Sequence, residues 1–177
     1  MDQEKLRFPT GTFADFQKDT TRDRAAKIAM IRDLPDQLDA LSTELDSTDW
    51  SRRYREGSWT GLQVLHHIAD SHLNAFCRIK LCLTEDRPSV KPYDENRWVE
   101  TADVLRAAPD SSLGIIRGIQ HRMALLLESI ADTDWARVCI HPEHGRELSV
   151  EFLCSLYAWH GRHHLGHLEL IRKGSTA

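Results

Sequence analysis

The sequence lacks any apolar run that approaches the ~20 residues of a membrane-spanning helix. We also expect no secretory leader, because the first five residues, MDQEK, are polar where a signal peptide needs positive charge followed by an apolar stretch. We therefore expect a cytoplasmic protein that makes no contact with a membrane.

An excess of basic charge is missing as well. The chain carries 23 lysine and arginine residues against 27 aspartate and glutamate residues, which gives a formal net charge of −4. Proteins that bind the phosphate backbone need clustered positive charge. The short basic group Arg52, Arg53 and Arg55 is typical of a solvated loop. The charge pattern therefore predicts no nucleic-acid partner.

Paired cysteines are also absent. Four cysteines are present, at positions 77, 82, 139 and 154, and no two of them form a CxxC motif. Cys77, Cys82 and Cys154 fall in helical patterns, where a reduced thiol packs as a small hydrophobic side chain. This usage predicts reduced cysteines rather than a disulfide framework or a cysteine-based metal site.

The chain shows no internal repeat, low-complexity tract or linker, and 41% of its 177 residues are hydrophobic. These features predict one domain, spanning residues 1–177, with a single core. Periodic apolar residues predict four long helices, at about 21–45, 61–83, 109–130 and 149–173. The fold class that follows is all-α, a four-helix bundle.

Local signals refine this expectation. Thr60 and Gln63 form a capping box at the start of the second long helix, and Pro35 predicts a kink or a break in the first. Ser149 is a candidate N-cap for the last helix, which ends at a glycine. The remaining expectations are an extended arm over 1–20, a loop over 49–58, a short helical piece over 96–107, and a small β-hairpin from 138–141 and 146–148.

The chain is rich in histidine, with ten in all and four within residues 160–167. His160 and His164 are one helical turn apart and lie within the apolar stripe of the last helix. Burying both without partners would cost ~1–3 kcal/mol for each unpaired polar atom, whereas a metal ion would pair both. The zinc-protease motif has the same histidine spacing, but Gly161 stands where that motif has glutamate. The pair therefore predicts a metal ion and does not name a reaction.

A metal site needs a third ligand, and the residues alone leave its identity open. The candidates outside the last helix are His66, His67, His72, His121 and His141. Periodicity favours His72, which lies on the apolar stripe of the second long helix. His67 instead begins a polar face that continues through Asn74 and Arg78, and such a face is suited to lining a wet pocket.

Several segments of the chain resemble the YfiT branch of the DinB superfamily, in matching order from about Phe8 to Ile171. These segments are EGSWT (56–60), VLHHIADSH (64–72), KPYDE (91–95), HP (141–142) and YAWHGRHH (157–164). The resemblance implies a four-helix bundle, a homodimer, and one divalent ion held by three histidines. The implied ligands are His67, which precedes an aliphatic residue, with His160 and His164.

Members of that branch have been described as metal-dependent hydrolases and as bacillithiol S-transferases. Three histidine ligands with open coordination positions are typical of a catalytic ion. The predicted function is therefore an enzyme in which the ion activates a bacillithiol-like small thiol for S-transfer to an electrophilic co-substrate. Arg78, Asn74 and His141 are candidate substrate contacts. The donor set favours zinc, with nickel expected after affinity purification.

Two alternatives stay open at this point. One is a hydrolase that uses metal-bound hydroxide, for which Glu143 or Glu56 is a candidate base. The other is a non-catalytic metal-binding protein, in which His163, His167 or His72 supplies a fourth ligand.

Overall fold

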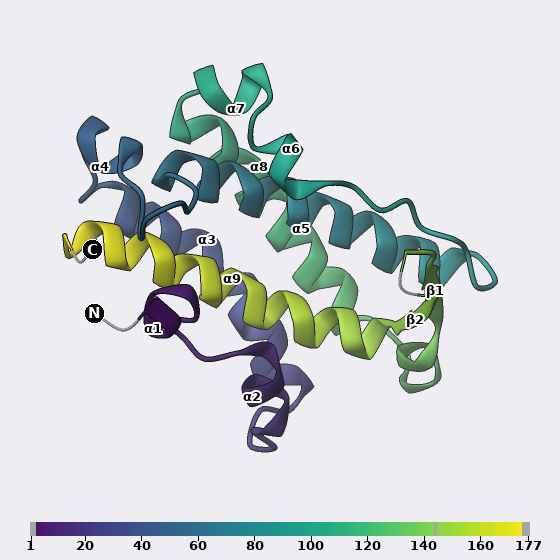
Figure 1. Cartoon of the computed structure of the whole chain (residues 1–177). Helices are drawn as coiled ribbons and strands as arrows, with labels where there is room; N and C mark the ends of the chain where they lie inside the picture. Colours follow the sequence, from purple (N-terminus) through teal and green to yellow (C-terminus); the bar gives the residue numbers. More distant parts are fainter. Residues whose placement is uncertain (1–2, 144, 175–177) are drawn as a thin grey trace.

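Long helices form the body of the molecule (Figure 1). The computed structural model describes residues 3–143 and 145–174. Its long helices are α3 (Arg24–Ser42), α5 (Gly61–Thr84), α8 (Pro109–Glu128) and α9 (Val150–Arg172). Helices α3 and α5 each pack against both α8 and α9, so the first two long helices stand at diagonal corners. The predicted all-α four-helix bundle is confirmed.

The two helices that carry most of the histidines begin at the predicted caps. Thr60 Oγ1 accepts a hydrogen bond from the backbone N–H of Gln63, and the Thr60 N–H donates to Gln63 Oε1 at 2.9 Å. Ser149 Oγ accepts from the N–H of Phe152 at 3.0 Å. Gly174, with φ of +63°, follows the end of α9 in the left-handed conformation that glycine adopts readily.

Pro35 does not break the first long helix, because α3 continues through it from Arg24 to Ser42. A proline inside a helix loses one backbone hydrogen bond and crowds the preceding turn. Here Pro35 is buried, and its neighbours Ile31 and Leu38 are 0% and 1% exposed. Of the kink or break expected at Pro35, the break is therefore wrong, since packing on both sides of the proline holds the helix together.

The expected extended arm over residues 1–20 is also wrong. The described part of this segment contains α1 (Gln3–Arg7) and α2 (Phe13–Lys18), both of which contact α9 (Figure 1). Leu6 and Phe16 anchor these short helices in the core, and Thr12 caps α2 through a capping box with Asp15. Tertiary packing stabilises helices that are too short to persist alone.

The connecting segments contain further short elements. Helix α4 (Ser47–Ser51) begins before the expected loop at 49–58 and occupies its first residues, and the piece expected at 96–107 is two helices, α6 (Glu95–Trp98) and α7 (Ala102–Arg106). A 3₁₀ helix, η1 (Asp132–Ala136), leads into the predicted hairpin. Its antiparallel strands are β1 (Val138–His141) and β2 (Arg146–Ser149), and position 144 of the turn lies outside the described residues.

The apolar core is divided into two clusters. One cluster lies toward the hairpin and includes Ile79, Met123 and Leu153, and the other includes Leu38 and Leu65. Along α5, α8 and α9 the boundary between the clusters is occupied by buried polar side chains. They are His67, Ser71, His72, Gln120, His163, His164 and His167. The expected single core is thus interrupted by a polar layer.

The cysteines in the described residues are free, and Cys82 and Cys154 are buried as predicted. Cys139, for which no packing was predicted, is buried as well. Cys77 is exposed, so its expected packing role is wrong. Within the described part of the chain, each helix is too short or too polar to cross a bilayer.

Candidate metal centre

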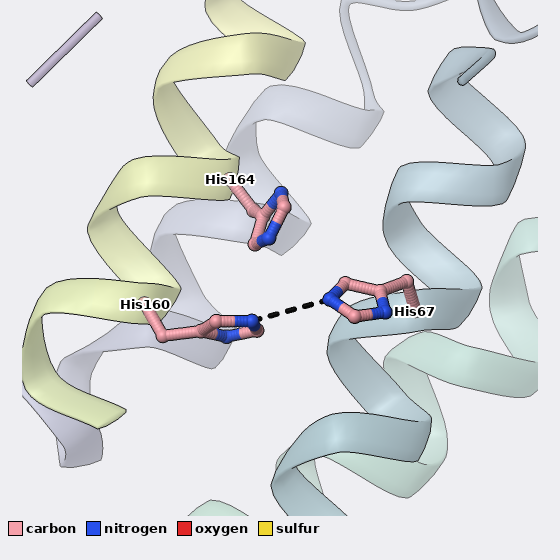
Figure 2. Close-up of side chains that lie close together, drawn as sticks. All are labelled: His67, His160 and His164. Atoms are coloured by element: carbon pink, nitrogen blue, oxygen red, sulfur yellow. Dashed lines mark hydrogen bonds between the residues drawn. The ribbon is translucent and has the colours of Figure 1, made fainter. Parts of the chain in front are cut away.

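Three histidines converge between α5 and α9 (Figure 2). One ring nitrogen from each of His67, His160 and His164 lies within 4.8 Å of the others. His67 and His164 are buried, and His160 is partly exposed. Figure 2 shows the rings pointing toward one another from two helices, with His67 on α5 opposite His160 and His164 on α9.

The spacing of the nitrogen atoms fits a shared ion. His67 Nε2 lies 3.2 Å from His160 Nε2. Two nitrogens that are each ~2.0–2.1 Å from one tetrahedral zinc ion are about 3.3 Å apart. Burial lowers the pKa of His67 to about 3 and that of His160 and His164 well below the usual value. Neutral rings offer the lone pairs that a metal requires.

Aromatic side chains hold the three rings in place. The Trp59 ring lies 4.7 Å from the His67 ring and is stacked on His164 at 6.3 Å. On the other side, Tyr157 lies 5.6 Å from His160. These contacts restrict the imidazoles to few rotamers and so reduce the entropy that an ion would otherwise remove on binding.

His160 and His164, the α9 pair, also have contacts on the sides of their rings that face away from His67. In each ring the Nδ1 atom lies close to another histidine. His160 Nδ1 lies 3.1 Å from His72 Nε2, and His72 Nδ1 lies 2.7 Å from the amide of Gln120. His164 Nδ1 lies 3.3 Å from His167 Nδ1, and His167 Nε2 lies 3.1 Å from the backbone oxygen of Arg7. Each candidate ligand on α9 is thus backed by a second histidine.

A cavity of about 390 Å³ opens next to the cluster. Its lining includes all three histidines together with polar and aromatic side chains. These are Trp59, Ser71, Arg78, Tyr93, Glu95, His141, Glu143, Tyr157, Trp159 and His163. The arrangement provides a metal-sized cluster at the wall of a pocket that can admit a small molecule.

Two of the three predicted substrate contacts lie at the cavity, and the third does not. Arg78 and His141 line the cavity, and Arg78 is held by a hydrogen bond from Nη2 to the Lys91 backbone oxygen at 3.2 Å. Asn74 is not among the described lining residues, and its amide donates to the Asp70 backbone oxygen at 2.9 Å.

The other histidine candidates occupy different places. His66 Nδ1 lies 2.6 Å from Ser112 Oγ, on the side of α5 that faces α8. His121 is exposed on α8, beside a groove with α3. His72 lies behind His160 rather than opposite it. Sequence reasoning gave no role to Gln120, Trp59 or the Arg7 carbonyl. Gln120 is a fully buried polar residue on an apolar helix face, and Trp59 stands within the EGSWT segment that carries the family resemblance.

A second histidine cluster adjoins the first. His163, His164 and His167 also place one nitrogen each within 4.8 Å of one another. All three are buried, and His164 belongs to both clusters. His163 stacks on Trp159 at 4.5 Å, and within the described part of the chain its buried Nδ1 atom has no hydrogen-bond partner.

Comparison with known proteins identifies relatives across the whole chain. The model of the DinB superfamily matches residues 30–168. A protein of Geobacillus thermodenitrificans named "Putative metal-dependent hydrolase" is 40% identical over 171 residues, which cover 96% of both chains. A Bacillus cereus protein of the same name is 39% identical over 168 residues, covering 95% of this chain and 96% of the relative.

Two solved structures share the fold. YfiT from Bacillus subtilis, described as a probable metal-dependent hydrolase with an unusual four-helix bundle topology, is 32% identical. Its TM-score is 0.89, and the match covers 98% of this chain and 99% of that one. A mycothiol-dependent maleylpyruvate isomerase is 17% identical with a TM-score of 0.59, covering 88% and 60% of the two chains, and this likeness extends to the fold alone.

Proposed function

Since the chain belongs to the DinB superfamily, we propose that it is a metal-dependent enzyme whose ion is held by His67, His160 and His164. The 3.2 Å separation of His67 Nε2 and His160 Nε2, together with the nearby His164 ring, is the observation that carries this proposal. The imidazole donor set suits zinc, and nickel is an acceptable substitute.

The reaction we favour is transfer of a small thiol, such as bacillithiol, to an electrophile. A divalent ion at this position supplies a Lewis acid that lowers the pKa of a bound thiol. The sulfur then attacks the electrophilic carbon, so that a C–S bond forms, the bond to the leaving group breaks, and the thiol proton passes to solvent. None of the described cysteines lines the cavity, so the nucleophilic sulfur has to come from the substrate.

The cavity contains groups that can recognise such a substrate. Arg78 places a guanidinium in the wall, and this group pairs well with a carboxylate. His141 lines the same cavity and is the second proposed contact. Asn74, whose amide is engaged on its own helix, receives no such support.

Hydrolysis is the second candidate, and the names of the relatives favour it. In this reaction water replaces the thiol as nucleophile. Of the two candidate bases, Glu143 lines the cavity and Glu56 is not among its described lining residues. The carboxylate of Glu143 is therefore the better placed to accept a proton from water.

Two measurements on the same preparation test the proposal. Elemental analysis of purified protein is expected to give one divalent ion per chain, and His160→Ala is expected to remove it. The loaded protein is expected to join a bacillithiol-like thiol to monochlorobimane with release of chloride, faster than the variant does. Turnover of esters or amides without added thiol would instead assign hydrolysis, and a wild-type sample that takes up no divalent ion would overturn the proposal.

A homodimer in the cytoplasm completes the proposal, on the basis of the resemblance to the YfiT branch. Light scattering of the metal-loaded protein at several concentrations measures the mass directly. A monomer at all concentrations would contradict the homodimer and leave the metal site unaffected.

A further inference from the structure

In the hydrogen bonds that link Arg7, His167 and His164, donor and acceptor can be assigned. Arg7 is the last residue of α1, so its carbonyl oxygen has no partner within that helix. A carbonyl oxygen only accepts hydrogen bonds. The contact of 3.1 Å between this oxygen and His167 Nε2 therefore requires that Nε2 carries a hydrogen.

The direction continues into the site. A neutral imidazole has one N–H and one bare nitrogen, so His167 Nδ1 is bare when Nε2 is protonated. His164 Nδ1 lies 3.3 Å from this bare atom and has to donate to it. The single hydrogen of His164 is then on Nδ1, and Nε2 is left with its lone pair.

The contacts behind His160 allow the same arrangement. His160 Nδ1 lies 3.1 Å from His72 Nε2, and His72 Nδ1 lies 2.7 Å from the Gln120 amide. The amide nitrogen faces His72, which leaves Gln120 Oε1 buried with no hydrogen-bond partner among the described residues. Nitrogen and oxygen exchange places on rotation of the amide. With oxygen toward His72, hydrogens lie on Nδ1 of both histidines, and His160 Nε2 is bare.

We propose that His167 and His72 are positioning residues, which fix His164 and His160 in the tautomer that presents Nε2 to the ion. The proposal rests on the proposed ligand set, and the geometry that carries it is the chain from Arg7 O through His167 to His164. The amino-terminal helix α1 thereby takes part in organising the site.

A second ion at His163, His164 and His167 is the competing explanation for the same cluster. That ion would need bare nitrogens, and His164 would have to offer Nδ1 to it while offering Nε2 to the first ion. The two explanations therefore make opposite statements about the hydrogen on His164 Nδ1 in the metal-loaded protein, and they predict different numbers of bound ions.

The first test uses metal-free wild-type protein labelled with ¹⁵N in its histidines. Long-range ¹H–¹⁵N correlation spectra separate bare from protonated imidazole nitrogens. We expect protonated Nδ1 and bare Nε2 in both His160 and His164. A bare Nδ1 in His164 would overturn the proposal. This result does not depend on metal binding, so it remains informative even if the proposed function fails.

The second test compares substitutions of His167. His167→Phe keeps an aromatic ring on Tyr54, which the histidine ring stacks on at 3.9 Å, and removes both nitrogens. His167→Gln offers an oxygen to His164 and an N–H to the Arg7 carbonyl. Loss of such supporting contacts typically weakens metal affinity by about 10- to 100-fold. We expect that loss for His167→Phe, with a mixture of His164 tautomers, and recovery of affinity and tautomer for His167→Gln.

A matched control is His66→Phe, which removes another buried histidine from α5, one that is bonded to Ser112. Its zinc affinity, measured by competition with a chromophoric chelator, is expected to equal that of the wild type. Equal affinity for His167→Phe would overturn the proposal. Binding of two zinc ions, with the second lost in both His167 variants, would assign the cluster to a second ion instead. If His167→Phe fails to fold, the proposal is tested by the tautomers in the wild-type spectrum and by the zinc affinity of His167→Gln.

Discussion

Gly161 occupies the position at which the paired-histidine motif of zinc proteases has its glutamate. A Cβ atom at this position would lie 2.6 Å from Leu34 Cδ2 and 3.5 Å from His72 Cε1. The glycine therefore leaves room for the Leu34 side chain of α3 against α9, and a glutamate would not fit without displacing that side chain. The sequence shows the missing base, and the packing shows why the base has to come from elsewhere in the cavity.

Substitution of Gly161 tests this packing. Gly161→Ala is expected to lower the free energy of unfolding by about 1 kcal/mol, because overpacking costs ~1–3 kcal/mol and exceeds the ~1 kcal/mol gained in helix propensity. Gly118→Ala is the control, since a Cβ atom at this exposed position of α8 meets nothing within 4 Å. It is expected to stabilise by up to about 1 kcal/mol. Urea denaturation of both variants measures the difference, and equal shifts would contradict the argument.

The choice between His67 and His72 shows where residue patterns stop being informative. The two positions differ by about 140° around a helix, yet both rings reach His160. His67 contacts its Nε2 atom, and His72 contacts its Nδ1 atom from the opposite side. Periodicity places His72 toward the core and cannot say which side of the partner ring it meets. Which histidine meets Nε2 of His160 and which meets Nδ1 depends on the position of α9 relative to α5, and that position is set by tertiary packing.

At the scale of elements, patterns of apolar residues located the four long helices and the hairpin. They did not locate α1 and α2, whose five and six residues are too few to show a period. These short helices depend on the burial of Leu6 and Phe16 and on a bond from Trp159 Nε1 to the Gly11 oxygen at 3.1 Å. Propensity is a weak guide where a few tertiary contacts decide the conformation.

The amino-terminal segment lies on α9 at a second glycine. A Cβ atom on Gly166 would lie 2.9 Å from Pro9 Cγ and 3.1 Å from Thr10 Cγ2. Gly166→Ala is therefore expected to loosen residues 3–18 and to speed amide exchange there, while exchange in α5 and α8 stays close to wild type. Hydrogen–deuterium exchange followed by mass spectrometry measures both regions. Unchanged exchange in the amino-terminal segment would show that Pro9 and Thr10 accommodate the added methyl group without loosening the segment.

For the molecule as a whole, the polar layer between the two apolar clusters determines the response to pH. Burial lowers the pKa of His67 and His167 to about 3 and that of His72 and His163 to about 4. The unfolded chain has histidine pKa values of ~6.5 and binds protons first as the pH falls. Each buried neutral ring therefore has no effect on the free energy of unfolding above pH ~6.5. As the pH falls from that value toward the pKa of the folded state, each ring lowers the free energy of unfolding.

The metal-free protein is accordingly expected to lose stability between pH 7.5 and pH 5. Each of these rings contributes a slope that approaches about 1.4 kcal/mol per pH unit once the pH is below ~6.5. Urea denaturation at several pH values measures the slope. His163→Phe, which keeps an aromatic ring on Trp159, is expected to make it shallower by the contribution of one ring. A stability that does not change between pH 7.5 and pH 5 would contradict the burial of these rings as neutral groups.

The order in which the site is assembled follows from where its parts lie in the chain. His67 and His160 are 93 residues apart, and the carbonyl that orients His167 precedes it by 160 residues. On the ribosome, His160 and His164 of α9 are synthesised after α3, α5 and α8. A nascent chain thus carries an unfinished site through most of its translation. The proposed ion can therefore be captured only after α9 has been synthesised.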